Sequence, residues 1–347
     1  MSNPEQLPRA VVFGCAGERL TSEERDFFAR TAPLGFILFA RNCRNPPQVR
    51  RLVEDLRASV GRADAPVLID QEGGRVVRLS PPVWRAAPAA AVFGRLAASD
   101  PEGARQAVEL NARLLAAELA DLGITVNCLP LLDVPVAGSH DVIGDRAFAD
   151  SAEVVADLGA AVMRGLLAGG VLPVIKHLPG HGRASVDSHH RLPVVGAPRK
   201  LLEETDFAPF RALAEAPLGM TAHVVYTGLD PAQPATTSQT VIDQIIRGSI
   251  GFQGLLFSDD LSMSALAGGL GDRAATALAA GCDVALHCNG KADEMAAVAA
   301  AVGPLGEPAR KRWSAAQARL QPPSPFDAEE ALTQLQRLLA QIGGTAA

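Results

Sequence analysis

Residues that can take part in acid–base chemistry stand at the ends of four short apolar runs. A single Asp after a strand is common, because it often caps the next helix. Four such ends point instead to one shared site, since the carboxyl ends of parallel strands meet at the same rim. The residues are Asp70 after residues 67–69, Lys176 and His177 after 174–175, His223 after 220–222, and Asp259 and Asp260 after 257–258.

The glycine- and histidine-rich segment 176–190 holds four of the seven histidines. It has neither helical nor strand periodicity, so it is predicted to be a long loop, a type of segment that is often functional. Asp187 and His189 are two residues apart and would point to the same side of an extended chain. A carboxylate beside an imidazole orients the ring and favours its protonated form, which makes a usable general acid/base.

A carboxylate nucleophile together with a separate proton donor is the usual equipment for glycoside hydrolysis. A metal site in the histidine-rich loop stays an alternative, although no His-x-x-x-His helix or Cys pair accompanies it. Gly73 and Gly74 are interpreted as a tight turn rather than a phosphate cradle. His140 and His190 are expected to be solvated loop residues, and Arg183 is expected at the surface.

Short apolar runs alternate with amphipathic segments over most of the chain, a pattern typical of buried parallel strands and covering helices. Ser22 and Ser151 are expected to cap two of the helices. The predicted strands are residues 10–13, 35–40, 66–69, 125–127, 172–175, 218–221, 255–258 and 284–287. The predicted helices are residues 22–30, 47–60, 101–122, 151–168, 200–214, 240–248, 272–280 and 292–302.

Eight strand–helix pairs are the number in a (β/α)₈ barrel of the α/β class, with a doubly wound sheet as the rival architecture. Residues 1–305 are expected to form this TIM-like barrel as the catalytic domain. Residues 306–347 are expected to be a C-terminal helical extension packed on it. In that extension a Pro-rich stretch, 320–325, precedes an amphipathic helix at 327–339.

The composition excludes several classes of protein. The net charge is −6, so the chain lacks the basic excess that nucleic-acid binding needs. It shows no secretory signal and no apolar run long enough to span a bilayer, and its five cysteines are expected to be free thiols. We therefore expect a cytoplasmic protein without nucleic-acid or membrane partners. Aromatic residues make up only 4%, which argues against a long groove of stacking rings.

Three ordered motifs make the chain resemble glycoside hydrolase family 3, and within it the bacterial β-N-acetylglucosaminidase (β-hexosaminidase) branch. They are IDQEGGRV at residues 69–76, KHLPGHG at 176–182 continued by DSH at 187–189, and FSDDLSM at 257–263. Weaker matches lie at residues 35–42, 143–148 and 220–223. The resemblance implies a TIM-like barrel and a monomeric enzyme that needs no cofactor and no metal.

The resemblance also implies a role for each matching residue. Asp259 would be the nucleophile that forms a covalent glycosyl-enzyme, while its neighbour Asp260 would point away and serve structure. His189 would be the general acid/base, with Asp187 as its partner. The sugar-binding residues would be Asp70, Arg78, Arg146, Lys176 and His177.

The implied substrate is a terminal β-linked N-acetylglucosamine on peptidoglycan fragments, namely N-acetylglucosaminyl-1,6-anhydro-N-acetylmuramic acid and its peptides. The alternatives are a phosphorylase or another β-glycosidase with the same site, and a catalytically idle sugar-binding protein. The scarcity of aromatic residues suits an exo-acting enzyme that holds one sugar in a polar pocket. Arg183 and Ala184 depart from the Asp-Thr usual in this branch, so either the loop conformation or the leaving-group preference is expected to differ.

Overall fold

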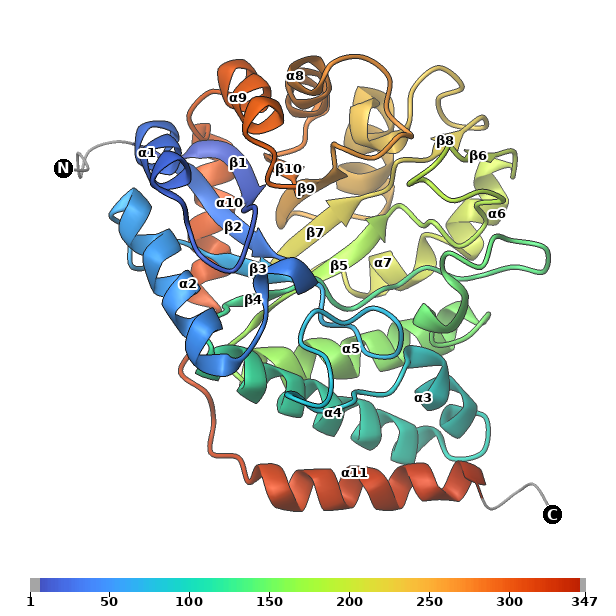
Figure 1. Ribbon diagram of the computed structural model, residues 1–347. Helices are drawn as coiled ribbons and strands as arrows, with labels where there is room; N and C mark the ends of the chain where they lie inside the picture. Colours follow the sequence, from blue (N-terminus) through green and yellow to red (C-terminus); the bar gives the residue numbers. More distant parts are fainter. Residues whose placement is uncertain (1–6, 344–347) are drawn as a thin grey trace.

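Eight parallel strands close into a barrel (Figure 1). The structure is a computed structural model and describes residues 7–343. Around the barrel the order is β1, β2, β3, β4, β5, β7, β9 and β10, and β10 pairs with β1 to close it. The predicted (β/α)₈ barrel with its eight strands is confirmed, and the rival doubly wound sheet is wrong. The strands are β1 Arg9–Gly14, β2 Pro33–Leu38, β3 Val67–Ile69, β4 Val126–Asn127, β5 Leu172–Leu178, β7 Leu218–Thr221, β9 Leu255–Asp260 and β10 Val284–His287.

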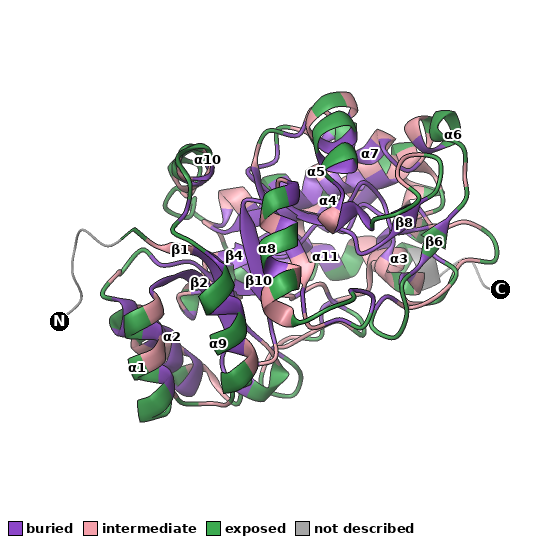
Figure 2. Ribbon diagram, turned by 90° about the horizontal axis from the view of Figure 1, so that it is seen from above, coloured by how far each residue is buried: buried purple, intermediate pink, exposed green. Residues whose placement is uncertain are grey.

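Helices surround the barrel, with their outer faces exposed and the strands buried (Figure 2). The α-helices are α1 Ser22–Thr31, α2 Pro46–Val60, α3 Ala90–Ala97, α4 Pro101–Asp121, α5 Ala152–Ala168, α6 Arg199–Glu204, α7 Ala208–Ala212, α8 Leu270–Ala280, α9 Ala292–Ala301, α10 Glu307–Ala318 and α11 Ala328–Gly343. A π-helix spans Val241–Ser249, and short 3₁₀ turns lie at Ala40–Asn42, Gly144–Arg146 and Ala235–Thr237. A separate pair of short strands, β6 Val194–Val195 and β8 Val225–Tyr226, lies outside the barrel.

The ends of two helices follow from local chemistry. Ser151 caps α5 as expected, because its hydroxyl accepts from the backbone N–H of Val154. The cap of α1 is Thr21 rather than Ser22. The Thr21 hydroxyl accepts from the Glu24 N–H, and the Glu24 carboxylate accepts from the Thr21 N–H. This reciprocal pair satisfies two donors that the first turn of a helix leaves free.

The segment predicted as one helix over 200–214 is two short helices, α6 and α7, with a break between them. Pro209 stands in the first turn of α7. Proline lacks the backbone N–H, and its ring clashes with the carbonyl four residues earlier, which is that of Thr205. A continuous helix across residues 205–209 is therefore excluded.

The sequence pattern does not predict α10, yet this helix closes the amino-terminal end of the barrel. Ala309 and Trp313 pack in the same apolar cluster as Leu34, Leu172 and Leu255, which begin or flank the starts of strands. With one end of the barrel filled by these side chains, the carboxyl end remains for a binding pocket.

The last helix, α11, lies along α4 and α3 (Figure 1). Ala331 and Leu335 are its buried apolar residues, and they join the core that α4 also lines. The division into a barrel domain at 1–305 and an extension at 306–347 stays a prediction, and residues 1–6 and 344–347 of it lie outside the described residues. No helix within residues 7–343 is both long and apolar enough to cross a membrane.

Candidate active site

One pocket at the carboxyl ends of the strands has a volume of about 330 Å³. The eight residues that the resemblance gives catalytic or sugar-binding roles all line it, although they come from the ends of three strands and from three loops. They are Asp70, Arg78, Arg146, Lys176, His177, Asp187, His189 and Asp259. The residues span 190 positions of the chain, so only closure of the barrel brings them together.

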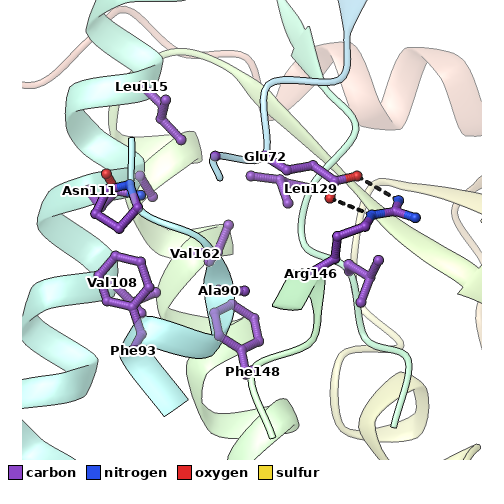
Figure 3. Close-up of a pocket in the computed structure, with 14 residues that line it drawn as sticks. Glu72, Ala90, Phe93, Val108, Asn111, Leu115, Leu129, Arg146, Phe148 and Val162 are labelled. Atoms are coloured by element: carbon purple, nitrogen blue, oxygen red, sulfur yellow. Dashed lines mark hydrogen bonds and ion pairs between the residues drawn. The ribbon is translucent and has the colours of Figure 1, made fainter. Parts of the chain in front are cut away.

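A buried ionic cluster forms one wall of this pocket. The Lys176 ammonium lies 2.9 Å from Asp70 Oδ1 and 2.7 Å from Glu72 Oε1, and its side chain is only 2% exposed. The Arg146 guanidinium donates to both oxygens of Glu72, at 2.8 and 2.9 Å (Figure 3). Arg78 donates to the second oxygen of Asp70 at 3.2 Å. Two carboxylates and three cations thus lock one another in place.

The charges of this cluster are stabilised mutually. Burial alone would raise the pKa of Glu72, but Lys176 and Arg146 outweigh it and lower that pKa to about 2. Burial likewise opposes ionisation of Asp70, yet Lys176 and Arg78 hold its pKa well below the usual range. Burial would lower the pKa of Lys176, and the two carboxylates raise it instead. All of these groups are therefore charged at neutral pH, and they can offer fixed hydrogen-bond partners to sugar hydroxyls.

Glu72 is a member of the cluster that the sequence analysis did not single out. A small apolar cavity lies behind it, lined by side chains such as Phe93, Leu115 and Phe148 (Figure 3). This apolar wall leaves the Glu72 carboxylate directed at Arg146. The only signal in the sequence is that Glu72 stands two residues after Asp70. In the structure it lies beside cations that need a second counter-charge.

Asp133 is a second functional residue missed from the sequence. Its side chain is fully buried. One oxygen accepts from the ring Nδ1 of His177 at 2.7 Å, and the other accepts from the backbone N–H groups of His177 and His181, at 3.2 and 2.6 Å. Burial by itself would raise the pKa of Asp133, but His177, followed by His181, lowers it to about 2. The carboxylate therefore fixes the Nδ1–H tautomer of His177, so that Nε2 faces the pocket.

Asp259 and Asp260 are the last two residues of β9 and both line the pocket, but backbone groups hold the Asp260 carboxylate. Asp260 accepts from the backbone N–H of Ser262 at 3.0 Å and of Cys288 at 3.2 Å, which makes it a structural carboxylate. Burial would raise the pKa of Asp259. His177, His223 and the Asp260 N–H outweigh this effect and lower the pKa, so Asp259 is an anion at neutral pH.

His223 acts on this strand end through the backbone rather than in the pocket. Its Nε2 lies 3.0 Å from the Asp260 carbonyl oxygen, and its Nδ1 lies 2.7 Å from the Thr236 hydroxyl. Burial lowers the pKa of His223, so the ring is neutral. A carbonyl can only accept, so the single proton of the ring is on Nε2 and Nδ1 is an acceptor. The Thr236 hydroxyl is shared between this Nδ1 and the Ala222 carbonyl oxygen, which lies 3.0 Å away. The residue thereby holds the peptide next to Asp259.

His189 and Asp187 pair as the sequence predicts, but for a different geometric reason. The His189 Nδ1 lies 2.7 Å from Asp187 Oδ1, and the same oxygen accepts from the His189 backbone N–H at 2.9 Å. The segment is a turn rather than an extended strand, since the Asp187 carbonyl accepts from the N–H groups of His190 and Arg191. Burial would raise the pKa of Asp187, yet the hydrogen bonds from His189 lower it.

Several other expectations about this region can be compared with the structure. His140 and His190 are exposed as predicted, and the turn at Gly73 and Gly74 has both residues at positive φ. The expectation for Arg183 is wrong: its guanidinium donates to the buried Asp206 at 2.6 Å and to Thr205 at 2.9 Å. The buried Asp206 carboxylate needs a counter-charge, and the Arg183 guanidinium supplies it.

Neither Tyr226 nor Trp84 lines the pocket. Tyr226 is fully buried, and its hydroxyl donates to the Gly180 carbonyl at the base of the loop. Trp84 is half-buried against the core. The five cysteines are free thiols, and within residues 7–343 no group of three or more His, Cys, Asp or Glu residues could hold a metal ion.

A parallel barrel whose carboxyl rim carries an ionised carboxylate, an imidazole pair and a fixed ionic wall is the architecture of a barrel hydrolase. The sequence profile of the glycosyl hydrolase family 3 N terminal domain matches residues 6–322. A β-hexosaminidase of Alkalilimnicola ehrlichii is 41% identical over 283 residues, which are 80% of each chain. The chain belongs to glycoside hydrolase family 3 and is a glycoside hydrolase.

Solved structures agree with this assignment. NagZ from Neisseria gonorrhoeae in complex with N-trifluoroacetyl-D-glucosamine is 34% identical, with a TM-score of 0.84 over 99% of this chain and 100% of that one. A family 3 β-N-acetylglucosaminidase from Paenibacillus is 31% identical, with a TM-score of 0.83 over 95% of this chain and 66% of that one. The resemblance inferred from three motifs is therefore confirmed at the level of the family and the fold.

Proposed function

We propose that the chain is a retaining exo-β-N-acetylglucosaminidase that removes a terminal N-acetylglucosamine, with Asp259 as nucleophile and His189 as general acid/base. The observation that carries this proposal is the shared pocket: the Asp259 anion and the Asp187–His189 pair line the same cavity. The names of the similar β-hexosaminidases and of NagZ support the choice of sugar.

The proposed reaction has two steps. Asp259 attacks the anomeric carbon while His189 donates the proton of its Nε2 to the departing oxygen, and a covalent glycosyl-enzyme forms. Water then attacks that carbon while His189 takes the proton of the water. The bond to Asp259 breaks, and the sugar is released with its β configuration retained. The Asp187 carboxylate holds the ring by its Nδ1–H and stabilises the imidazolium.

The ionic wall would bind the sugar and leave the anomeric carbon in line with Asp259. Asp70 and the unprotonated Nε2 of His177 would accept from ring hydroxyls, while Arg78, Arg146 and Lys176 would donate to others. The volume of about 330 Å³ lies at the small end of the usual 300–1,000 Å³ for ligand pockets, which suits one sugar better than a polymer.

We further propose that the substrates are peptidoglycan fragments, N-acetylglucosaminyl-1,6-anhydro-N-acetylmuramic acid and its peptides, and that the protein serves cytoplasmic peptidoglycan recycling. A terminal β-linked N-acetylglucosamine is the feature that such fragments share. Hydrolysis of the purified disaccharide, with free N-acetylglucosamine as the product, checks this choice. Cleavage confined to chitin-derived oligomers would contradict it.

The mechanism is tested with an aryl N-acetyl-β-glucosaminide and the Asp259→Ala variant. Turnover should be abolished, whereas Asp145→Asn, an exposed rim carboxylate outside the pocket, should keep normal rates. NMR should show the β anomer of N-acetylglucosamine as the first product. Near-normal rates for Asp259→Ala, or the α anomer formed first, would show that the mechanism is wrong.

Added phosphate separates hydrolysis from phosphorolysis at the same site. An imidazole acid/base does not repel phosphate as a carboxylate would, so sugar 1-phosphate is the product to look for. Its absence supports the hydrolase. Activity that survives exhaustive chelation excludes a metal in the histidine-rich loop.

A further inference from the structure

Two polar residues, His181 and Ser188, are buried in the loop that carries His189, although Ser185, His189 and His190 near them are exposed. The His189 side chain is 61% exposed and Ser185 is exposed, whereas His181 and Ser188 are each only 3% exposed. Burying a hydroxyl and an imidazole is unfavourable unless each finds a hydrogen-bond partner. The partners of these two residues therefore show what holds the loop.

Ser188 is held from two directions. Its hydroxyl lies 3.2 Å from the Nε2 of His181, and its carbonyl accepts from the backbone N–H of Ala265 at 3.2 Å. His181 belongs to the stem of the same loop, while Ala265 belongs to the segment after β9, the strand that ends in Asp259 and Asp260. Ser188 is also the residue between Asp187 and His189. The contacts of this one residue thus connect the acid/base pair to both sides of the pocket.

His181 is itself fixed by the buried carboxylate of Asp133. The His181 backbone N–H donates to Asp133 Oδ1, and the other oxygen of Asp133 holds the ring of His177. The rings of His177 and His181 pack edge to face, with their centroids 5.7 Å apart. A chain of direct contacts therefore runs from His177 through Asp133 and His181 to Ser188.

The protonation state of His181 follows from its surroundings. Burial, with the nearby His177 as a second cause, lowers the pKa of His181 to about 4, so the ring is neutral and carries one proton. In the described chain Nδ1 has no hydrogen-bond partner. A buried N–H without an acceptor is rarer than a buried acceptor without a donor. The proton is therefore on Nε2 and is donated to the Ser188 hydroxyl.

We propose that His181 and Ser188 form a latch that positions the Asp187–His189 pair for proton transfer. The inference rests on the proposed role of His189. Both latch residues are positioning residues, because they act through the loop. With the latch closed, His189 is confined although its own ring is mostly exposed. With the latch open, the ring samples other positions, and a misplacement of about 1 Å can cost about 100-fold in rate.

The test compares Ser188→Ala on two aryl N-acetylglucosaminides, one with a good and one with a poor leaving group. A good leaving group departs without a proton. We therefore expect kcat/KM to fall about 10- to 100-fold for the poor leaving group and less than about 3-fold for the good one. Ser185→Ala, an exposed serine in the same loop, is the matched control and should leave both rates unchanged. Hydrogen exchange of residues 184–191 should become faster in Ser188→Ala.

The double variant separates the latch from the acid/base assignment. If Ser188 acts only through His189, then Ser188→Ala in the His189→Ala background should change no rate further. Equal losses for both leaving groups in Ser188→Ala, or an added loss in the double variant, would overturn the latch. If His189→Ala itself slows both substrates equally, the proposed acid/base role fails. If it shows the leaving-group pattern and Ser188→Ala does not, only the latch fails.

Discussion

The carboxylate of Glu72 receives two N–H groups of the Arg146 guanidinium, at 2.8 and 2.9 Å, in a geometry that fixes both side chains. One of its oxygens also lies 2.7 Å from the ammonium of Lys176. A single buried carboxylate therefore compensates two cations on the ionic wall of the pocket. Planar two-point pairing of this kind sets orientation as well as energy.

Replacing Glu72 by Gln should damage both the fold and the proposed activity. The amide removes the charge that two buried cations need, so the free energy of unfolding should fall by about 3–5 kcal/mol. Arg146 and Lys176 would also lose their alignment, and kcat/KM for an aryl N-acetylglucosaminide should drop about 10- to 100-fold. Denaturant unfolding and steady-state kinetics measure the two effects.

Glu118→Gln is the control for that variant. Glu118 pairs with Arg85 at 3.2 Å, and both side chains are largely buried away from the pocket. This variant should lose stability and keep its kcat/KM. If Glu72→Gln keeps wild-type kinetics, the ionic wall does not align the substrate.

The contribution of the Glu72 carboxylate to stability should depend on pH. Burial would raise the pKa of Glu72, but Lys176 and Arg146 lower it to about 2 in the folded chain, against an ordinary value of 4.5. Because the folded pKa is the lower one, the contribution to stability is complete above pH 4.5 and is lost as the pH falls toward 2. The difference in unfolding free energy between wild type and Glu72→Gln should therefore narrow between pH 5 and pH 3. Urea titrations at several pH values measure it, and a constant difference would contradict the assignment.

Arg183 should stabilise the loop stem through Asp206. The Asp206 side chain is only 1% exposed, and Arg183→Ala would leave its carboxylate without a cation. We expect a loss of about 3 kcal/mol in the free energy of unfolding. Burial raises the pKa of Asp206 even with Arg183 present, so its charge is costly. The double variant Arg183→Ala with Asp206→Asn should therefore recover at least about 1 kcal/mol. A double variant less stable than Arg183→Ala would contradict a charge-based anchor.

Gly182 should tolerate no side chain. A Cβ at this position would lie 2.0 Å from the Val134 carbonyl oxygen, which is backbone and cannot move aside. Gly182→Ala should destabilise the protein by about 1–3 kcal/mol, as overpacking does, and should displace the loop stem. Gly17→Ala, where a Cβ meets nothing within 4 Å, should change stability by less than about 0.5 kcal/mol. Thermal unfolding of both variants gives the comparison, and equal stabilities would refute the steric argument.

Much of the barrel could be predicted because its strands are short apolar runs that need no distant information. The runs at 218–221 and 284–287 coincide with β7 and β10, and the tail helix predicted at 327–339 overlaps α11 over residues 328–339. The segment at 200–214 is harder to predict, because its apolar pattern is helical while Pro209 interrupts the helix. The sequence of α10 has only a weak apolar periodicity. The helix is buried because it covers the amino-terminal end of the barrel, which the local sequence does not reveal.

The candidate site divides in the same way. Asp187 and His189 are close in sequence, so their pairing could be predicted, although a turn rather than an extended chain brings them together. Asp133 carries no such signal. It stands in a loop far from His177 in sequence, and only their contact in space shows that the carboxylate orients the ring.

The sequence by itself determined the strand count, the three motifs and the residue types of the site, since these depend on local pattern and composition. Tertiary structure alone decided which charges compensate one another, because ionic pairing depends on distance and burial rather than on order along the chain. Glu72 with Arg146 and Arg183 with Asp206 are ionic pairs of this kind, and the hydrogen bond between neutral His181 and Ser188 depends on the fold in the same way. Each becomes strong only where folding has removed the competing water.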